Sequence, residues 1–144
     1  MADDPHDLKR FVDAQNPAYA RVVAELRGGQ KQSHWMWFVF PQLSGLGHSA
    51  MAQRYAITSI EEARAYIAHP VLGARLRECT AVVLAAHDRT LSQIFGAPDD
   101  MKFCSCMTLF AHAAPDEPLF RDGLEKCFGG REDETTLSLL RTAH

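Results

Sequence analysis

Residues 98–113 read PDDMKFCSCMTLFAHA, and this stretch decides the fold. Proline and two acids favour a helix start, because Pro fits the first turn and carboxylates are stabilised near the positive end of the helix dipole. Apolar side chains then recur with helical spacing at Phe103, Cys106, Met107 and Phe110. Since the segment carries little charge after Lys102, it is apolar almost all round, which is typical of a buried helix. We therefore predict that this helix is buried.

The rest of the chain carries the same helical period. Capping signals precede several apolar stripes, as at Ser59, where Glu62 follows three residues later, and at Thr90. Only residues 35–40 have the composition of a strand, and a single strand has no partner. The sequence predicts an all-α, compact multihelical fold with one globular domain over residues 1–144, of which residues 1–6 form a flexible N-terminus.

Composition narrows the class of protein. A net charge of −3 without a cluster of Lys and Arg argues against nucleic acid as a partner. The apolar run at residues 35–41 is far below the ~20 residues that cross a bilayer, so we expect no membrane contact and a cytoplasmic location. The four cysteines show no metal spacing, and we expect neither metal nor cofactor. Association between copies of the chain stays open.

Residues 33–42, SHWMWFVFPQ, combine both tryptophans with polar groups at either end. Such a segment is typical of a pocket wall, and equally of a core. As pocket residues we single out Trp37, Phe40 and Gln42. His34 could act as an acid or base near neutral pH, although a structural histidine is the commoner case.

A glycine turn follows at residues 45–50, GLGHSA, which fits the pattern G-x-G-x-x-A. No parallel strand–helix alternation surrounds it, so a dinucleotide-binding loop is disfavoured. Ser49 is expected to cap a short helix through Tyr55, and its free N–H groups could hold an anion beside Arg54. An ordinary turn and cap explain the same residues.

The helix from Pro98 has a second, polar seam that includes Ser105 and Thr108. Buried hydroxyls need partners, which are either the backbone four residues earlier or a ligand. Lys102 and Asp100 lie nearest to this seam. Asp100 is our candidate for a carboxylate that acts on a glycosidic bond, although the helix dipole accounts for an acid at this position without chemistry.

Residues 33–47 resemble the signature of a mainly bacterial family that is catalogued as domain of unknown function 1810. Residues 51–57, 69–73, 94–96 and 107–110 extend the resemblance, which covers about residues 7–140. The family is similar, more distantly, to the multihelical YbiA-like or NADAR proteins, and this implies a ligand of the phosphoribosyl or ADP-ribosyl kind. YbiA-like proteins carry a Ser-Glu pair at the start of a helix, whereas Ser49 is followed by Ala50 here.

Three hypotheses for function result. The first is an N-glycosidase-type hydrolase, or a processor of ADP-ribose or phosphoribosyl derivatives. In this hypothesis Asp100 and His34 are catalytic. Ten side chains would bind the ligand: Trp37, Phe40, Gln42, Ser49, Gln53, Arg54, Tyr55, Lys102, Ser105 and Thr108. The second is a non-catalytic sensor that binds a nucleotide in the same pocket. The third is a protein-interaction module, which requires exposed tryptophans.

Overall fold

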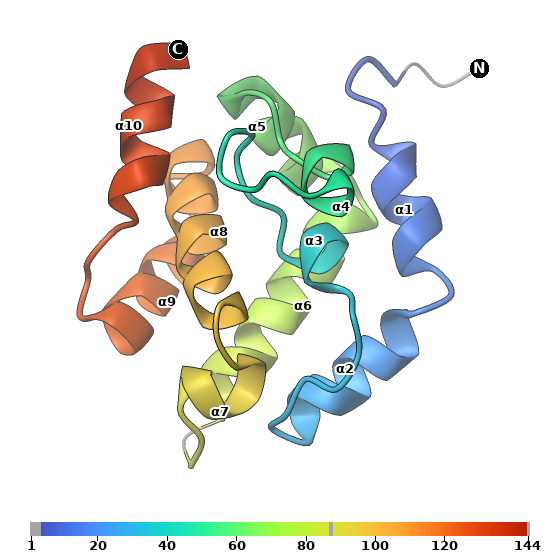
Figure 1. Cartoon of the computed structure of the whole chain (residues 1–144), viewed down its shortest axis with the longest axis vertical. Helices are drawn as coiled ribbons and strands as arrows, with labels where there is room; N and C mark the ends of the chain where they lie inside the picture. The colour runs from blue at the N-terminus through green and yellow to red at the C-terminus, as the bar shows by residue number, and fades with distance from the viewer. Residues whose placement is uncertain (1–3, 87, 144) are drawn as a thin grey trace.

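The structure is a computed structural model that describes residues 4–86 and 88–143. These residues form ten helices and no strand, which confirms the all-α prediction. In Figure 1, α8 lies beside α9 and α10, whereas α1 and α2 lie on the opposite side of the molecule, beyond α6. The helices are α1 (Lys9–Gln15), α2 (Tyr19–Arg27), α3 (Met36–Val39), α4 (Ala50–Arg54), α5 (Ile60–Ala68), α6 (Leu72–Ala85), α7 (Leu91–Phe95), α8 (Asp99–Ala113), α9 (Pro118–Phe128) and α10 (Glu134–Ala143).

Helix α8 is a buried helix, as its sequence predicts. It packs against α5, α7, α9 and α10, and its side chains from Phe103 through Ala111 are all buried. The Phe103 ring lies at the junction of several elements, with Phe40 at 5.1 Å, Phe95 at 5.3 Å and Phe128 at 6.5 Å between ring centroids. The core is therefore largely aromatic where α8 packs against Phe40 and Phe95.

Capping explains where several of the helices begin. The Ser59 side chain accepts a hydrogen bond from the Glu62 amide, as predicted, and Thr90 forms a complete capping box with Gln93. Ser49 accepts from the Ala52 amide at the start of α4. These caps satisfy amides that a helix start leaves free.

The aromatic segment forms a helical turn and not the strand that its composition allows. Helix α3 covers Met36–Val39, and the Phe40 amide donates to the Met36 carbonyl at 3.0 Å. Among the described residues this segment has no strand neighbour; the amides of Phe38, Val39 and Phe40 donate within the turn, and the Phe38 carbonyl accepts from the Gln15 side chain at 2.6 Å. The turn sends the Trp37 side chain to one side and keeps Phe38 and Phe40 in the core.

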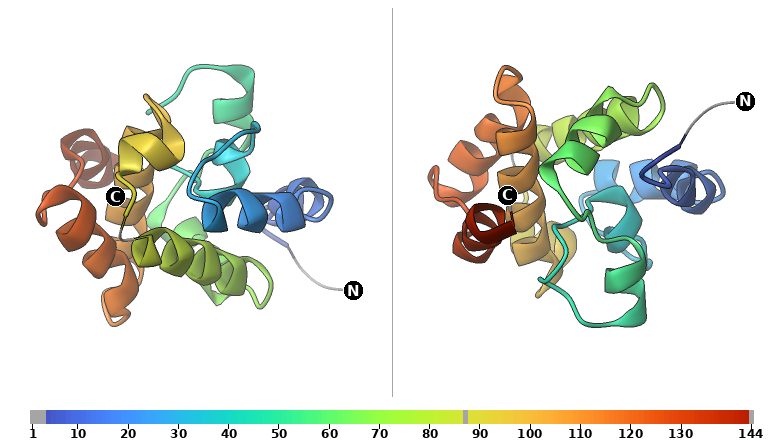
Figure 2. Two further views of the ribbon diagram at one scale, coloured as in Figure 1. Left: turned by 90° about the horizontal axis from the view of Figure 1, so that it is seen from below. Right: turned by 90° about the horizontal axis from the view of Figure 1, so that it is seen from above.

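A loop of residues 42–57 carries α4 and projects from one side of the helical bundle (Figure 2). Its two ends are held together by a single parallel bridge between Leu43 and Ile57. The Ser44 amide donates to the Ile57 carbonyl at 2.7 Å, and the Ile57 amide donates to the Gln42 carbonyl at 2.9 Å. Closed ends and its own short helix make this segment an Ω-type loop, a kind that is frequently functional.

Arg10 of α1 fastens the far end of this loop. Its guanidinium donates to the carbonyls of Arg54 and Ala56, at 2.9 Å each, and forms an ion pair with the buried Glu62 at 2.8 Å. None of the helices in the described ranges is long and apolar enough to cross a membrane.

Candidate functional site

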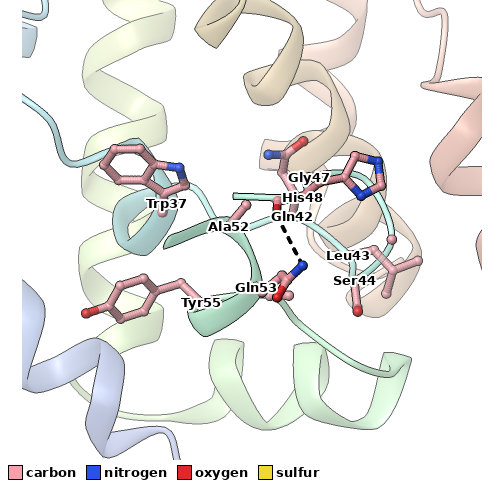
Figure 3. A pocket seen from close by; sticks show the side chains of 11 residues that line it. Trp37, Gln42, Leu43, Ser44, Gly47, His48, Ala52, Gln53 and Tyr55 are labelled. Atoms are coloured by element: carbon pink, nitrogen blue, oxygen red, sulfur yellow. Dashed lines mark hydrogen bonds between the residues drawn. The ribbon is translucent and has the colours of Figure 1, made fainter. Parts of the chain in front are cut away.

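Two adjoining hollows, of about 250 and 420 Å³, lie beneath the loop of residues 42–57. They share five lining residues and together form what we call the Trp37 groove: Trp37, Gln42, Gly47, His48 and Ala52. Figure 3 shows these residues around α4 and the loop before it, with the Trp37 ring on one side and the Gln42 and His48 side chains on the other. The larger hollow continues to α8, where Met101, Lys102 and Ser105 form the opposite wall. The combined volume is in the range of small-molecule sites.

Three polar side chains at the groove lack an internal partner. Within the described part of the chain, the Trp37 indole N–H, the Gln42 amide and the His48 imidazole make no hydrogen bond to another protein group. Polar groups in a concave site without protein partners are the ones that a ligand or water can engage. The groove therefore contains hydrogen-bond donors and acceptors next to the aromatic ring of Trp37.

Close backbone packing shapes the loop wall. A Cβ added at Gly47 would lie 2.5 Å from the Ala52 Cβ, so this position needs glycine for the loop to approach α4. Gln53 reinforces the same approach, because its amide donates to the His48 carbonyl at 3.2 Å (Figure 3). The position of His48 is therefore set by α4.

The α8 wall carries a chain of charges. Lys102 Nζ lies 3.1 Å from Asp99 Oδ1, and Lys31 Nζ lies 3.0 Å from Asp99 Oδ2. Lys102 also stands over the Trp37 ring, with Nζ 5.7 Å from the ring centroid. Ser105 lines the groove and is buried. Its hydroxyl donates to the Met101 carbonyl at 3.2 Å, so its partner is the backbone four residues earlier, as is common for a serine within a helix.

Seven of the predicted ligand-binding residues line the groove. They come from α3, from the loop with α4 and from α8: Trp37, Gln42, Ser49, Gln53, Tyr55, Lys102 and Ser105. Tyr55 is 7% exposed and packs mainly on Phe11 and Phe38, so it contributes to the core as well as to the wall.

Three other predicted ligand-binding residues lie elsewhere. Phe40 is fully buried among aromatic rings. Thr108 is also fully buried, where its hydroxyl donates to the Cys104 carbonyl and accepts from the Asp133 amide, each at 2.9 Å. Arg54 lines a separate hollow with Arg10 and residues of α1.

The two predicted catalytic residues also lie outside the groove lining. His34 is exposed, and Asp100 accepts a hydrogen bond from the Met101 amide at 2.9 Å. The hydrolase hypothesis places Gln42, Arg54, Ser105 and Asp100 in one pocket, and of these Gln42 and Ser105 line the groove. Helix geometry explains the result for Asp100, because it lies five residues before Ser105 and so points about 140° away from it around α8.

Sequence reasoning missed His48, Lys31 and the pairing role of Asp99. His48 was visible only as a position within the glycine turn. Asp99 was explained by the helix dipole, and its partner Lys31 comes from the connection between α2 and α3. No local pattern links these residues, because tertiary packing alone brings them together.

Among the described residues, neither a thiol nor a carboxylate lines the groove. Burial raises the pKa of the Cys79 thiol to about 12 and that of Cys104 to about 11, so both thiols are protonated at neutral pH. No carboxylate lines the groove, and no cluster of potential metal ligands occurs in the described ranges. What the groove offers is hydrogen bonding, an aromatic wall and one ammonium group.

Comparisons with known proteins agree on the family and the fold. Residues 5–140 match the model of a family described as "Protein of unknown function (DUF1810)". The chain is 56% identical to the conserved hypothetical protein Rv1873 from Mycobacterium tuberculosis, whose crystal structure superposes with a TM-score of 0.94 over 96% of this chain and 99% of that one. A comparison with curated proteins gave no match.

Proposed function

We propose that this chain, which belongs to the DUF1810 family of proteins of unknown function, binds a nucleotide or a ribosyl derivative in the Trp37 groove. One observation carries the proposal: three polar side chains that have no hydrogen-bond partner in the described part of the chain line two adjoining hollows beside the Trp37 ring. The ligand class comes from the distant similarity to YbiA-like proteins, which is itself part of the proposal.

The groove suits a ligand that has a ring and several polar substituents. The half-buried Trp37 indole gives a flat apolar surface, against which a base or sugar ring packs. The Gln42 amide can both donate and accept, as hydroxyl groups and base edges require. Met101, which is 55% exposed, and Leu46 extend the apolar side toward solvent, where a ligand would cover them.

Binding without hydrolysis is the form of this proposal that the site supports best. Glycosidases use carboxylates on either side of the scissile bond, and an oxocarbenium-like transition state needs negative charge beside it. The described lining has no carboxylate, Asp99 is occupied by two lysines, and Asp100 lies outside. We therefore place the sensor hypothesis above the hydrolase.

The interaction-module hypothesis has less support. It requires that both tryptophans face solvent, whereas Trp35 is 1% exposed and its indole N–H donates to Glu25 at 2.9 Å. Only Trp37 reaches the surface, and it does so inside a hollow.

A ligand screen with matched variants tests the proposal. ADP-ribose, NAD and ribose 5-phosphate are added separately, and the midpoint of thermal unfolding is followed together with release of free base by chromatography. At least one compound is expected to raise the midpoint in the wild type without product. Gln42→Met should weaken binding of that compound about fivefold, since one hydrogen bond is worth about 1 kcal/mol. Gln30→Met makes the same change at an exposed site elsewhere and should leave binding unaltered.

The outcomes separate the hypotheses. Stabilisation with release of base would favour the hydrolase over the sensor. Absence of any stabilisation across the panel, or equal binding by wild type and Gln42→Met, would overturn the proposal.

A further inference from the structure

We infer that the ligand of the Trp37 groove carries an oxyanion, and that Lys102 holds this group. The inference rests on the proposed function and adds the charge of the ligand and the end of the groove where that charge lies. Its basis is the arrangement of Lys31, Asp99 and Lys102, which no part of the proposal for ring binding uses.

The Asp99 carboxylate forms ion pairs with two lysines. Each oxygen of Asp99 takes one ammonium group, Oδ2 from Lys31 at 3.0 Å and Oδ1 from Lys102 at 3.1 Å. The side chains of Lys31, Asp99 and Lys102 are 10%, 17% and 27% exposed, so all three are largely withdrawn from water. Charges in such surroundings are screened less than charges at an open surface.

The three groups together keep one positive charge. Lys31 is the more buried cation, with its Nζ 5.4 Å from the centre of the Trp35 ring, and it is not among the residues that line the groove. Lys102 is the cation that lines the groove. Because Asp99 must also balance Lys31, it neutralises Lys102 only in part.

Among the described residues of the lining, no other group neutralises the remaining positive charge of Lys102. An ammonium group has three N–H donors, and Asp99 is the one ion-pair partner of Lys102 in the described residues. The lining adds His48 and no acid. A phosphate or carboxylate on the ligand would take the remaining N–H donors of Lys102 and neutralise the excess charge.

The Trp37 ring allows anion binding at Lys102 to be detected by fluorescence. Lys102 Nζ lies 5.7 Å from the ring centroid, so an anion bound to this ammonium group comes within short range of the indole. The tryptophan fluorescence of the wild type is therefore expected to respond to an oxyanion alone.

The first experiment titrates pyrophosphate at constant ionic strength and follows tryptophan fluorescence. A saturable change is expected for the wild type and for Lys102→Arg, which keeps the charge, and its loss is expected in Lys102→Met. Lys9→Met is the matched control, because Lys9 is paired with one aspartate on α1 away from the groove, 2.6 Å from Asp13 Oδ2. Thermal unfolding of each variant shows whether it is folded. An unchanged response in Lys102→Met, or no response in the wild type, would overturn the inference.

The second experiment compares AMP with adenosine by the same readout. Tighter binding of AMP by about tenfold or more, with the difference abolished in Lys102→Met, would support the oxyanion site. Equal affinity for AMP and adenosine would overturn this inference and leave the proposed nucleotide site standing. Binding of pyrophosphate without binding of any nucleotide or ribosyl compound would support the anion site and overturn the proposed function.

Discussion

Glu25 shows how one side chain positions the aromatic segment. Its carboxylate accepts from the Gln32 amide at 2.7 Å, the Ser33 amide at 3.1 Å, the Ser33 hydroxyl at 2.6 Å and the Trp35 indole at 2.9 Å. Burial by itself raises the pKa of Glu25, but these hydrogen bonds outweigh it and lower the pKa from 4.5 to about 2. The ionised form thus holds the connection between α2 and α3, which leads directly to Trp37.

Replacing Glu25 by Gln should lower stability at pH 7 by about 1–2 kcal/mol, because hydrogen bonds to a charged acceptor are lost. A depressed pKa in the folded state stabilises the protein above pH 4.5, and this contribution disappears as the pH falls toward 2. Urea unfolding at pH 7 and pH 3 measures both effects. A Glu25→Gln protein whose stability falls between these pH values as steeply as the wild type would contradict this role.

At the scale of elements, a buried glutamine joins four helices. Gln15 of α1 donates to the Phe38 carbonyl of α3 at 2.6 Å and to the Tyr66 hydroxyl of α5 at 3.1 Å. Arg75 of α6 donates to the Gln15 Oε1 at 3.3 Å. Because Phe38 follows Trp37, this network also determines where the groove wall stands relative to the bundle.

Gln15→Leu should cost about 2–4 kcal/mol, because it keeps the volume but leaves the Phe38 carbonyl and Tyr66 hydroxyl buried without their donor. Asn16→Leu is the control, since Asn16 is exposed and its side chain accepts one hydrogen bond among the described residues, from Arg75 at 2.9 Å. We expect it to cost less than about 1 kcal/mol. Chemical denaturation compares the two, and similar losses for both would show that the buried network is not what joins these helices.

At the scale of the whole molecule, the aromatic core around α8 carries the fold. Phe103 is fully buried and touches rings from α7, α9 and the end of α3. Its neighbour Met101 on the same helix is 55% exposed. Stability is therefore expected to depend sharply on the face of α8 that a substitution changes.

Phe103→Ala should lower the free energy of unfolding by about 3–5 kcal/mol through lost burial and the cavity that remains. Met101→Ala should stay within about 0.5 kcal/mol. Thermal and urea unfolding give both values. A Phe103→Ala protein as stable as Met101→Ala would refute the central position of α8.

The helices could be predicted from sequence because their signals are local. The stripe from Phe103 to Phe110 and the caps at Ser59 and Thr90 need only neighbours within one or two turns. The turn at Met36–Val39 was harder, since its aromatic residues also suit a strand and the missing partner strand is a property of the whole fold.

The candidate site was predictable only in part, for the same reason. Trp37, Gln42 and Ser105 could be singled out, because polar groups within apolar runs are visible in sequence. Arg54 was expected to hold an anion beside the helix start at Ser49, yet it lines a different hollow. The Lys31–Asp99 pair joins two segments far apart in the chain, and only the packing of α8 against the α2–α3 connection reveals it.

The indole N–H resonances of the two tryptophans test the central claim most directly. In ¹H–¹⁵N spectra, ADP-ribose is expected to shift the Trp37 signal, whose N–H is free of a protein partner among the described residues, and to leave Trp35, which donates to Glu25, unmoved. Assignment by Trp37→Phe identifies the signals. A shift of Trp35 alone, or of neither signal at saturating ligand, would contradict a ligand site in the Trp37 groove.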